Sequence, residues 1–128
     1  KRAAEVAEDR EYVFTILGRR ARFTDRNYSY RAANRIVQGG SADILKYKMV
    51  EIENAIIADG LEDEIRMILT VHDSLVFEVL KERAQWCIDY VRVKMENVQC
   101  EPFNLRVPFK ADYKYGANWA EATYGKAA

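Results

Sequence analysis

Residues 65–79, IRMILTVHDSLVFEV, place the only histidine of the chain and an aspartate in the middle of an apolar run. Valine, isoleucine, leucine and phenylalanine on both sides are typical of β-strands, and the polar triplet HDS between them is typical of a turn. The pattern predicts two strands, residues 64–71 and 75–80, that meet at the triplet as a hairpin. The hairpin tip would hold His72 and Asp73 at a fixed position outside the core.

Asp73 at the tip of a rigid hairpin is well placed to hold a hard cation. Mg²⁺ is usually bound by one or two carboxylates, with waters and substrate phosphates completing its coordination. The alternative is structural, because an aspartate in a β-turn commonly bonds to its own backbone. His72 likewise has an alternative as a turn or packing residue. The hairpin alone does not decide between these interpretations.

Two amphipathic helices are predicted, one before and one after the hairpin. The first starts at Ser41, a good N-cap residue, and ends near Asp59-Gly60. Its apolar face recurs at spacings of four, three and four in Leu45, Met49, Ile52 and Ile56. The face of the second recurs at spacings of four, three, four and three in Ala84, Ile88, Val91, Met95 and Val98. Before the first, a short helix over residues 31–38 is expected to be interrupted or kinked by Gly39-Gly40.

A third strand completes the predicted sheet, because apolar residues alternate in Leu105, Val107, Phe109 and Ala111. The order helix–strand–strand–helix–strand predicts an α+β fold with helices on one face of an antiparallel sheet. At the N-terminus we expect a helix over residues 2–11, then a small hairpin of residues 12–16 and 19–23. Turn-like composition is found in residues 24–30 and 114–119.

Composition bounds the class of protein. A length of 128 residues and a hydrophobic content of 49% fit one globular domain with a sizeable core. No apolar run approaches the roughly 20 residues that span a bilayer, and the first residues are too charged for a signal peptide. Cys87 and Cys100 match neither a metal-binding spacing nor a disulfide framework, so we expect reduced thiols and an intracellular protein.

The net charge of zero hides an asymmetry along the chain. From Gly18 to Lys48 there are eight basic residues and two acidic ones, whereas from Met49 to Glu101 there are twelve acidic residues and five basic ones. This split suggests one face that meets a polyanion and another that holds carboxylates. Solvated helix faces would explain the same split, so charge alone leaves both interpretations open.

Four segments resemble, in the same order, motifs of the family A DNA polymerases, the DNA polymerase I family. The hairpin segment VHDSLVFEV resembles the VHDEL-type motif, in which the hairpin aspartate binds catalytic magnesium. Upstream, YVFTILGRRARF resembles the family's YVxTxxGRRRxx segment, which leads from the fingers back to the palm. The stretch RAANRIVQGGSADILKYKMVEI resembles its RxxxNxxxQGxxADxxKxAM helix region, and YGANWAEA resembles its final GxNWxxA stretch. Four motifs in family order are far more specific than any one of them.

The resemblance implies an antiparallel palm sheet with a metal-binding β-hairpin, packed on one face by two long helices, as an incomplete polymerase domain. Residues 1–30 would form the end of the fingers and the return to the palm, and residues 31–128 would form the C-terminal part of the palm. The implied reaction adds deoxynucleotides to a primer 3′-hydroxyl with two Mg²⁺ ions. The implied partners are primer–template DNA, deoxynucleoside triphosphates, and the upstream palm and fingers polypeptide, in the same chain or as a second one.

The resemblance also implies roles for individual residues. Asp73 would be a ligand of the catalytic Mg²⁺ ions, and His72 would lie near the primer terminus as a second catalytic and DNA-binding residue. Asn34 and Gln38 would contact the minor groove, together with Arg31, which lies one residue closer to the asparagine than in the family. The remaining matches are Arg19 and Arg20 (solvated or phosphate-facing), Lys46 (structural or phosphate-facing), and Asn118 and Trp119 (packing of the tail).

Two departures from the family pattern matter. Ser74 stands where the family usually has glutamate; it cannot be a charged ligand but can bond to a metal-bound water, so we expect it to tune catalysis. The second catalytic aspartate, which the family carries in a DYSxIELR-like stretch, and the nucleotide-binding fingers helix are not found before Tyr12. One hairpin aspartate cannot hold two ions about 3.5–4 Å apart. The chain alone is therefore expected to be inactive, as a fragment or as one subunit of a split enzyme.

Two other classes of function stay open. Ser74 and the missing aspartate favour a non-catalytic DNA-binding or regulatory module derived from a palm. A structural α+β domain, whose hairpin turn only resembles the motif, is the second. The expected location is the cytoplasm or nucleoid, the host cytoplasm for a viral protein, or an organelle.

Overall fold

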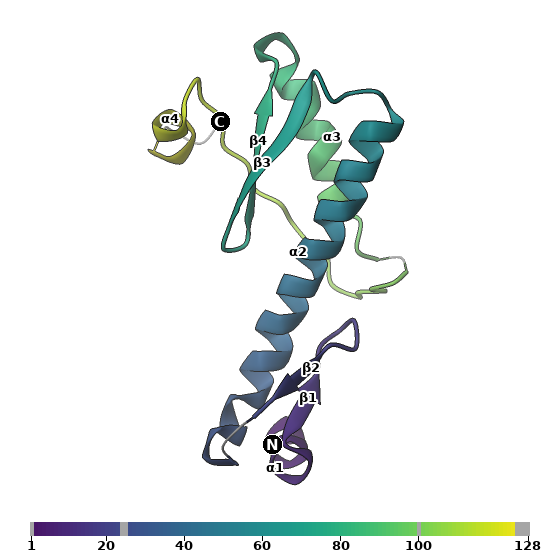
Figure 1. Cartoon of the computed structure of the whole chain (residues 1–128), viewed down its shortest axis with the longest axis vertical. Coiled ribbons are helices and arrows are strands. Elements are labelled where there is room, and N and C mark those ends of the chain that lie inside the picture. Colours follow the sequence, from purple (N-terminus) through teal and green to yellow (C-terminus); the bar gives the residue numbers. More distant parts are fainter. Residues whose placement is uncertain (1, 24–25, 100, 125–128) are drawn as a thin grey trace.

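The computed structural model describes residues 2–23, 26–99 and 101–124, and Figure 1 shows the order of the elements. The long helix α2 (Ala32–Ala58) runs through the molecule, and the other elements lie beside its two halves. Beside the first half lie α1 (Arg2–Arg10), β1 (Tyr12–Phe14), β2 (Arg20–Arg22) and the 3-10 helix η1 (Arg26–Arg31). After α2 the chain forms β3 (Ile65–Val71), β4 (Ser74–Val79), the 3-10 helix η2 (Lys81–Arg83), α3 (Ala84–Glu96) and α4 (Trp119–Tyr124).

The strands β3 and β4 form the antiparallel hairpin that the sequence predicts. Val71 pairs with Ser74, so that His72 and Asp73 alone make the turn. His72 has a φ of 55°, in the left-handed region that residues with a side chain rarely adopt. The hairpin therefore turns more tightly than predicted, and its two turn residues are the histidine and the aspartate singled out above.

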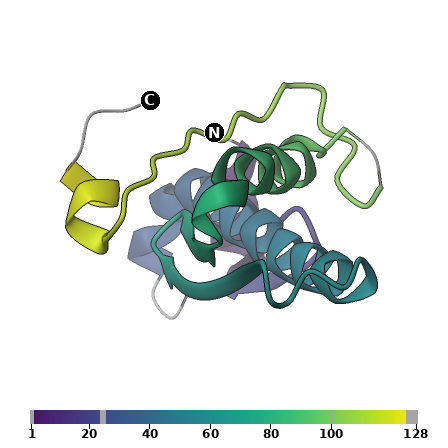
Figure 2. The same ribbon diagram turned by 90° about the horizontal axis from the view of Figure 1, so that it is seen from above.

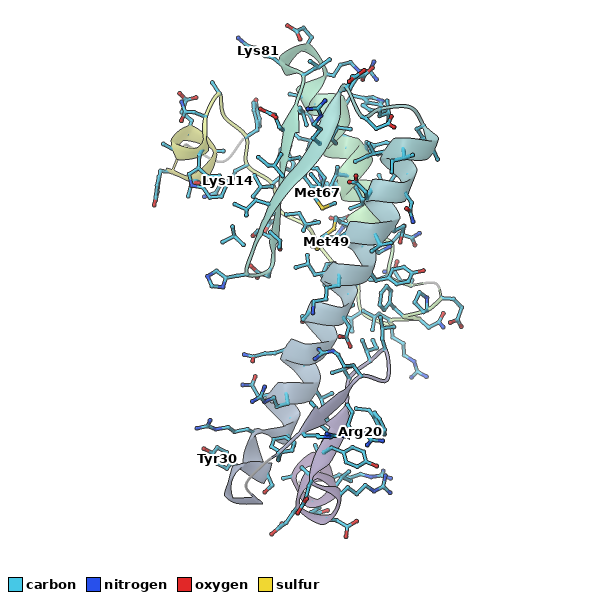
Figure 3. All side chains as sticks on the ribbon, in the orientation of Figure 1. Arg20, Tyr30, Met49, Met67, Lys81 and Lys114 are labelled. Atoms are coloured by element: carbon cyan, nitrogen blue, oxygen red, sulfur yellow. The ribbon has the colours of Figure 1, made fainter. Side chains whose placement is uncertain are left out.

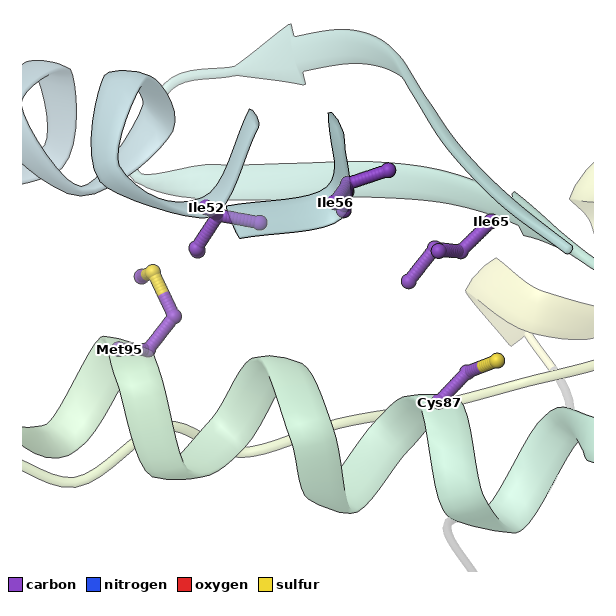
Figure 4. Close-up of a cluster of buried hydrophobic side chains, with 5 residues drawn as sticks. All are labelled: Ile52, Ile56, Ile65, Cys87 and Met95. Carbon is purple, nitrogen blue, oxygen red and sulfur yellow. The ribbon is translucent and has the colours of Figure 1, made fainter. Parts of the chain in front are cut away.

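The inner face of this hairpin packs against both α2 and α3, as predicted for two helices that cover one face of a sheet (Figure 4). The buried centre of the cluster consists of Ile52, Ile56, Ile65, Cys87 and Met95. Seen from above, α3 lies alongside α2 (Figure 2). Burial of an aliphatic side chain contributes about 1.5–3 kcal/mol, so this core holds the hairpin in place.

The helix α2 is continuous, so the interruption expected at Gly39-Gly40 and the N-cap expected at Ser41 are both wrong. The reason for glycine at this point is close packing with the end of β1. A Cβ atom on Gly39 would lie 2.6 Å from Cγ2 of Thr15, closer than two carbon atoms can pack. Glycine here permits two elements to approach each other, and the lower helix propensity is overridden by that packing.

The two halves of α2 bury different faces. Ala32 and Ile36, in the first half, pack against α1 and the β1–β2 pair, whereas Ile52 and Ile56, in the second half, pack against the β3–β4 hairpin and α3. The apolar stripe of the second half therefore does not continue on the same face of the first half, which is why the sequence pattern predicted the helix to begin too late. No helix in the described ranges is long and apolar enough to cross a membrane.

The third strand predicted over residues 105–111 is not a strand, and no described residue from 97 to 118 pairs in a sheet. Leu105 and Phe109 do pack inward, against a cluster that contains Ile44 and Val98, whereas Val107 is 70% exposed. The alternation thus matches burial at Leu105 and Phe109 and fails at Val107. A strand also needs a neighbouring strand for its backbone groups, and the described part of the chain offers none to this segment.

Residues 114–118, in the predicted turn of residues 114–119, are irregular with a bend at its end, and the helix α4 follows from Trp119. The Oδ1 atom of Asn118 accepts a hydrogen bond from the backbone N–H of Glu121 at 3.0 Å, and the Glu121 carboxylate accepts one from the backbone N–H of Ala117 at 3.0 Å. These bonds satisfy the first turn of the helix, as in a capping box. Asn118 is therefore a helix cap, and Trp119, half-exposed, packs only in part.

Candidate metal and nucleic-acid site

The tip of the β3–β4 hairpin presents an unpaired carboxylate. Asp73 is exposed, and its carboxylate makes no hydrogen bond or ion pair with any residue that the structure describes. The structural alternative required a bond from Asp73 to its own turn. The turn is held differently: the Thr70 hydroxyl donates a hydrogen bond of 3.3 Å to the backbone oxygen of Ser74. Asp73 is therefore free to bind a ligand, while the strands fix its position.

The donors at this tip fit one part of a magnesium site. Asp73 carries carboxylate oxygens, the kind of ligand that Mg²⁺ prefers, and the neighbouring Ser74 is exposed. No group of three or more histidine, cysteine or acidic side chains that could hold a metal occurs among the described residues. The hairpin can thus contribute to a metal site, but further carboxylates must come from elsewhere.

Asn34 and Gln38 lie in line along α2 with Ile52 and Ile56, which pack against the hairpin and α3. Asn34 precedes Ile52 by eighteen residues, about five turns at 3.6 residues per turn, and Gln38 precedes Ile56 by the same number. The two amides therefore continue the line of Ile52 and Ile56 into the first half of the helix, where both amide side chains are exposed. Figure 1 shows the hairpin tip pointing along α2 toward that half. Asp73 and the amides therefore share one side of the molecule without touching.

Arg31 lies at the N-terminal boundary of α2 and is exposed. Its Nε atom donates a hydrogen bond of 3.0 Å to the hydroxyl of Tyr30, and its guanidinium lies 5.4 Å from the centre of the Tyr30 ring. Tyr30, labelled in Figure 3, was not singled out from the sequence. The pair sets a positive charge at the end of α2 that carries Asn34.

Arg19, left between a solvated and a phosphate-facing role, proves to join the β1–β2 loop to α2. Its Nε atom lies 2.8 Å from Oδ1 of Asp43, and its Nη2 atom donates a hydrogen bond of 3.2 Å to the backbone oxygen of Gly39. Asp43 is only 5% exposed. Burial acts to raise the pKa of the Asp43 carboxyl, but hydrogen bonds from Thr15 and Arg19 and the charge of Arg19 outweigh it and lower the pKa. Arg19 thus serves the fold.

Two more basic residues make contacts within the chain, and they differ in exposure: Arg20 is exposed, whereas Lys48 is buried. Arg20 lies with its guanidinium 4.4 Å from the centre of the Tyr12 ring. Lys48 is 2% exposed, and its Nζ atom lies 2.7 Å from Oε2 of Glu51. Lys48 therefore cannot contact phosphate, whereas Lys46, two residues earlier, is exposed. A count of charges along the sequence could not distinguish a buried basic residue such as Lys48 from an exposed one such as Lys46.

Comparison with known proteins gives consistent matches. A sequence model of the family described as DNA polymerase family A matches residues 1–121. DNA polymerase I of Rhizobium leguminosarum is 36% identical over 126 residues, which cover 91% of this chain and 12% of the relative. DNA polymerase DpoZ of Vibrio phage phiVC8 is 37% identical over 122 residues, which cover 94% of this chain and 18% of the phage protein.

Among solved structures, the POL domain of Pol1 from M. smegmatis, in complex with DNA primer-template and dNTP, is similar with a TM-score of 0.78 and 33% sequence identity. The similarity covers 95% of this chain and 22% of that one. This chain thus spans a small part of each of these three polymerases, but the match extends over nearly all of its own length. By family match, sequence identity and fold together, the chain belongs to DNA polymerase family A.

Proposed function

We propose that this chain forms the C-terminal palm portion of a template-directed DNA polymerase, which adds deoxynucleotides to a primer 3′-hydroxyl together with the upstream palm and fingers. The observation that carries the proposal is the unpaired Asp73 carboxylate at the tip of a hairpin whose position is fixed by its packing. Helix periodicity, which puts Asn34 and Gln38 in line with Ile52 and Ile56, supports it. Its relatives are named DNA polymerases, and the M. smegmatis domain was solved with DNA primer-template and dNTP, which supports this assignment.

Asp73 would hold the catalytic Mg²⁺ ions together with a second aspartate from the upstream palm. When bound, such ions supply the positive charge that activates the primer hydroxyl and stabilises the pyrophosphate leaving group. Asp73 contributes a ligand whose position is fixed in advance, because the core beneath the hairpin and the two-residue turn limit its movement. The polypeptide described here therefore supplies one side of the metal site.

Asn34 and Gln38 would bind the minor groove of the primer–template end. Their amide groups can donate to the acceptors that every correct base pair presents there. Such contacts test the shape of a base pair without preferring one sequence, as a copying enzyme requires. Arg31, exposed beside the start of α2, would contact a backbone phosphate, so we expect its replacement to reduce the salt dependence of binding.

His72 and Ser74 flank the metal ligand and would adjust its surroundings. His72 is exposed at the tip, where its imidazole can contact the primer terminus. The Ser74 hydroxyl can bond to a metal-bound water where a glutamate would add a negative charge. If Ser74→Glu gave a large gain in rate, the native site would be shown to be impaired.

The hairpin also carries an apolar surface suited to the missing part of the palm. Ile68, Leu69 and Val71 on β3 are exposed, although β3 is flanked on one side by β4. A strand with apolar side chains and an unpaired edge is a place for another strand to bind. We propose that the upstream palm, with the second aspartate, covers this surface.

The test uses the Rhizobium leguminosarum polymerase with its matching segment replaced by this chain. Primer extension is measured with Mg²⁺ for the chimera and for its Asp73→Asn variant. We expect the substitution to lower the rate by about a thousandfold, because loss of a metal ligand removes several kcal/mol of transition-state stabilisation. Asp63→Asn, at another fully exposed aspartate, is the matched control and should leave the rate unchanged.

Equal rates for the chimera and its Asp73→Asn variant would contradict the proposal. A chimera that binds primer–template normally but does not extend it, even with Ser74→Glu, would favour the non-catalytic DNA-binding module instead. The observation that favours the non-catalytic module is Ser74, which stands at the position where the family usually has glutamate.

A further inference from the structure

Four side chains share one exposed face of the first half of α2. In order along the helix they are Asn34, Val37, Gln38 and Ser41. Spacings of three, one and three residues place them on one side of a helix that turns once in about 3.6 residues. All four are exposed, Val37 to 68%. Leu45, one turn after Ser41, is half-buried and packs against the cluster that contains Ile52. The exposed face therefore ends where the packing beneath the hairpin begins.

The hydroxyl of Ser41 is not used by the fold. It makes no hydrogen bond with any residue that the structure describes, and the same is true of the side-chain amides of Asn34 and Gln38. In the interior of a helix, serine is less favourable than alanine by about 0.5 kcal/mol. The hydroxyl thus stabilises nothing within the described chain, and it is available to a ligand.

Ser41 is the polar residue of this face that lies nearest the hairpin tip along the helix. The tip points along α2 toward the first half (Figure 1), and Ser41 is the last polar residue of the face before the packed half begins. With a rise of about 1.5 Å per residue, Ser41 lies about 4.5 Å beyond Gln38 along the axis. Neighbouring base pairs of a duplex are about 3.4 Å apart. Ser41 would therefore meet a base pair about one step nearer to Asp73 than Gln38 does.

We propose that Ser41 is a further specificity-determining residue, which contacts the minor-groove edge of the base pair at the primer terminus. This inference rests on the proposed function and adds to it a residue and the base pair that this residue reads. The hydroxyl would donate to N3 of a purine or O2 of a pyrimidine, the acceptors that every correct pair presents in the minor groove. A mispair displaces these acceptors, so the hydrogen bond is lost and the next addition is slowed.

The short side chain suits this selective role. A serine hydroxyl extends only a small distance from the helix, so it bonds to an acceptor only where the edge of the base pair comes close to α2. The longer side chains of Asn34 and Gln38 tolerate a more distant edge. The face thus becomes more selective toward Asp73, where a mispaired primer end has to be recognised before it is extended.

The experiment uses the chimera of this chain with the Rhizobium leguminosarum polymerase. Extension is measured from a matched and from a mismatched primer terminus. Ser41→Ala should lower the rate from the matched terminus about two- to tenfold, the effect of one lost hydrogen bond, and leave the rate from the mismatched terminus unchanged. Ser41→Thr keeps the hydroxyl and should restore most of the matched rate. Asn54→Ala, at an exposed position on another side of α2, is the control and should extend both termini as the parent does.

A base analogue distinguishes a direct contact from an indirect effect. In 3-deazaguanine a carbon atom replaces the N3 acceptor, so a hydrogen bond to that position is already absent. Two duplexes carry the analogue, one at the primer terminus and one opposite it in the template. In one of the two, Ser41→Ala should extend at the parent's rate, and binding of the same duplexes should show the same pattern by anisotropy. If Ser41→Ala lowered the rate equally with guanine and with both analogues, the proposal would be overturned.

Thermal melting excludes a purely structural role. Ser41→Ala should melt at or slightly above the parent's temperature, because alanine favours the helix. A lower melting temperature, or parent rates from every terminus, would overturn the proposal. The two levels of inference fail separately: if Asp73→Asn stops extension and Ser41→Ala changes nothing, the proposed function stands and the role of Ser41 is wrong. If Asp73→Asn extends as fast as the parent, both are wrong.

Discussion

The two hairpins of this chain contact the same long helix but end in opposite ways. The β1–β2 loop is fastened to α2 through Arg19, which binds Asp43 at 2.8 Å and the backbone of Gly39 at 3.2 Å. The β3–β4 tip ends in Asp73, whose carboxylate contacts none of the side chains in the described ranges. The contacts of the β1–β2 loop link it to α2 and so stabilise the fold. The tip of β3–β4 carries an unpaired carboxylate that can bind a ligand.

The comparison also separates two aspartates that look alike in the sequence. Asp43 is buried and paired with an arginine, so its charge is compensated within the chain. Asp73 is exposed, and the rigid strands beneath it restrict its movement without compensating its charge. A carboxylate that is fixed in place but unpaired has no evident value for stability. We therefore infer function from the contrast between the two, and the predictions below test that contrast.

The largest expected effect concerns the core that holds the free hairpin. Ile52 is fully buried beneath it, so Ile52→Ala should lower the free energy of unfolding by about 2–5 kcal/mol, the loss typical of a cavity in a packed core. Ile57→Ala, half-exposed on the same helix, should change it by less than about 0.5 kcal/mol. Urea unfolding measures both. Similar losses for the two variants would show that the hairpin is not held by this core.

The second prediction concerns the fastened loop. Gly39→Ala should lower the free energy of unfolding by about 1–3 kcal/mol, because the new methyl group would overlap Thr15 at 2.6 Å. Gly40→Ala is the matched control: its methyl group would meet Ile16 at an ordinary 3.6 Å. We expect the control to gain up to about 1 kcal/mol from helix propensity. If the free energy of unfolding rose in both variants, Thr15 would not be in close contact with Gly39.

These glycines mark the limit of what the sequence predicts. The hairpin tip at His72 and Asp73 and the helix through Met95 follow from local patterns, because strand and helix periodicities report which side chains are buried. The continuity of α2 through Gly39 depends on a contact with Thr15, twenty-four residues away, which no local pattern contains. The same limit applies to Lys48, whose burial follows from the elements packed around it.

The candidate site was predicted by resemblance more than by pattern. The spacing of Asn34 and Gln38 places both on one side of a helix, and only the folded chain shows that Ile52 and Ile56, further along the same line, pack against the hairpin and α3. The unpaired state of the Asp73 carboxylate is also a property of the folded chain. The absence of a third strand over residues 105–111 arises because alternation cannot specify a neighbouring strand.

The third prediction uses pH to distinguish the two aspartates. Pairing lowers the pKa of Asp43 in the folded chain, so its contribution is present above the unfolded pKa, about 4, and is lost as pH falls through the folded value. Asp43→Asn should cost about 1 kcal/mol at pH 7, since Arg19 is half-exposed and the pair partly screened. Below about pH 4, the free energy of unfolding should also decrease less with falling pH in Asp43→Asn than in the parent.

Asp73→Asn provides the matching measurement. With no partner to lose, it should change the free energy of unfolding at pH 7 by less than about 0.5 kcal/mol. Urea unfolding at several pH values between about 3 and 7 compares the two variants with the parent. If Asp73→Asn cost as much as Asp43→Asn, the hairpin aspartate would have a structural partner and the contrast between the two would fail.

The smallest expected effect lies at the turn itself. His72 holds a left-handed φ of 55°, which strains a residue that has a Cβ atom but not glycine. His72→Gly should therefore raise the free energy of unfolding by up to about 1 kcal/mol, whereas His72→Ala, which keeps the Cβ atom, should not. Both variants remove the imidazole, so the difference between them in urea unfolding isolates the backbone strain. If the two were equally stable, the turn would be unstrained. If glycine is the more stable, the parent keeps a histidine at this tip at a cost to its own stability, as expected where the side chain is retained to contact a ligand beside Asp73.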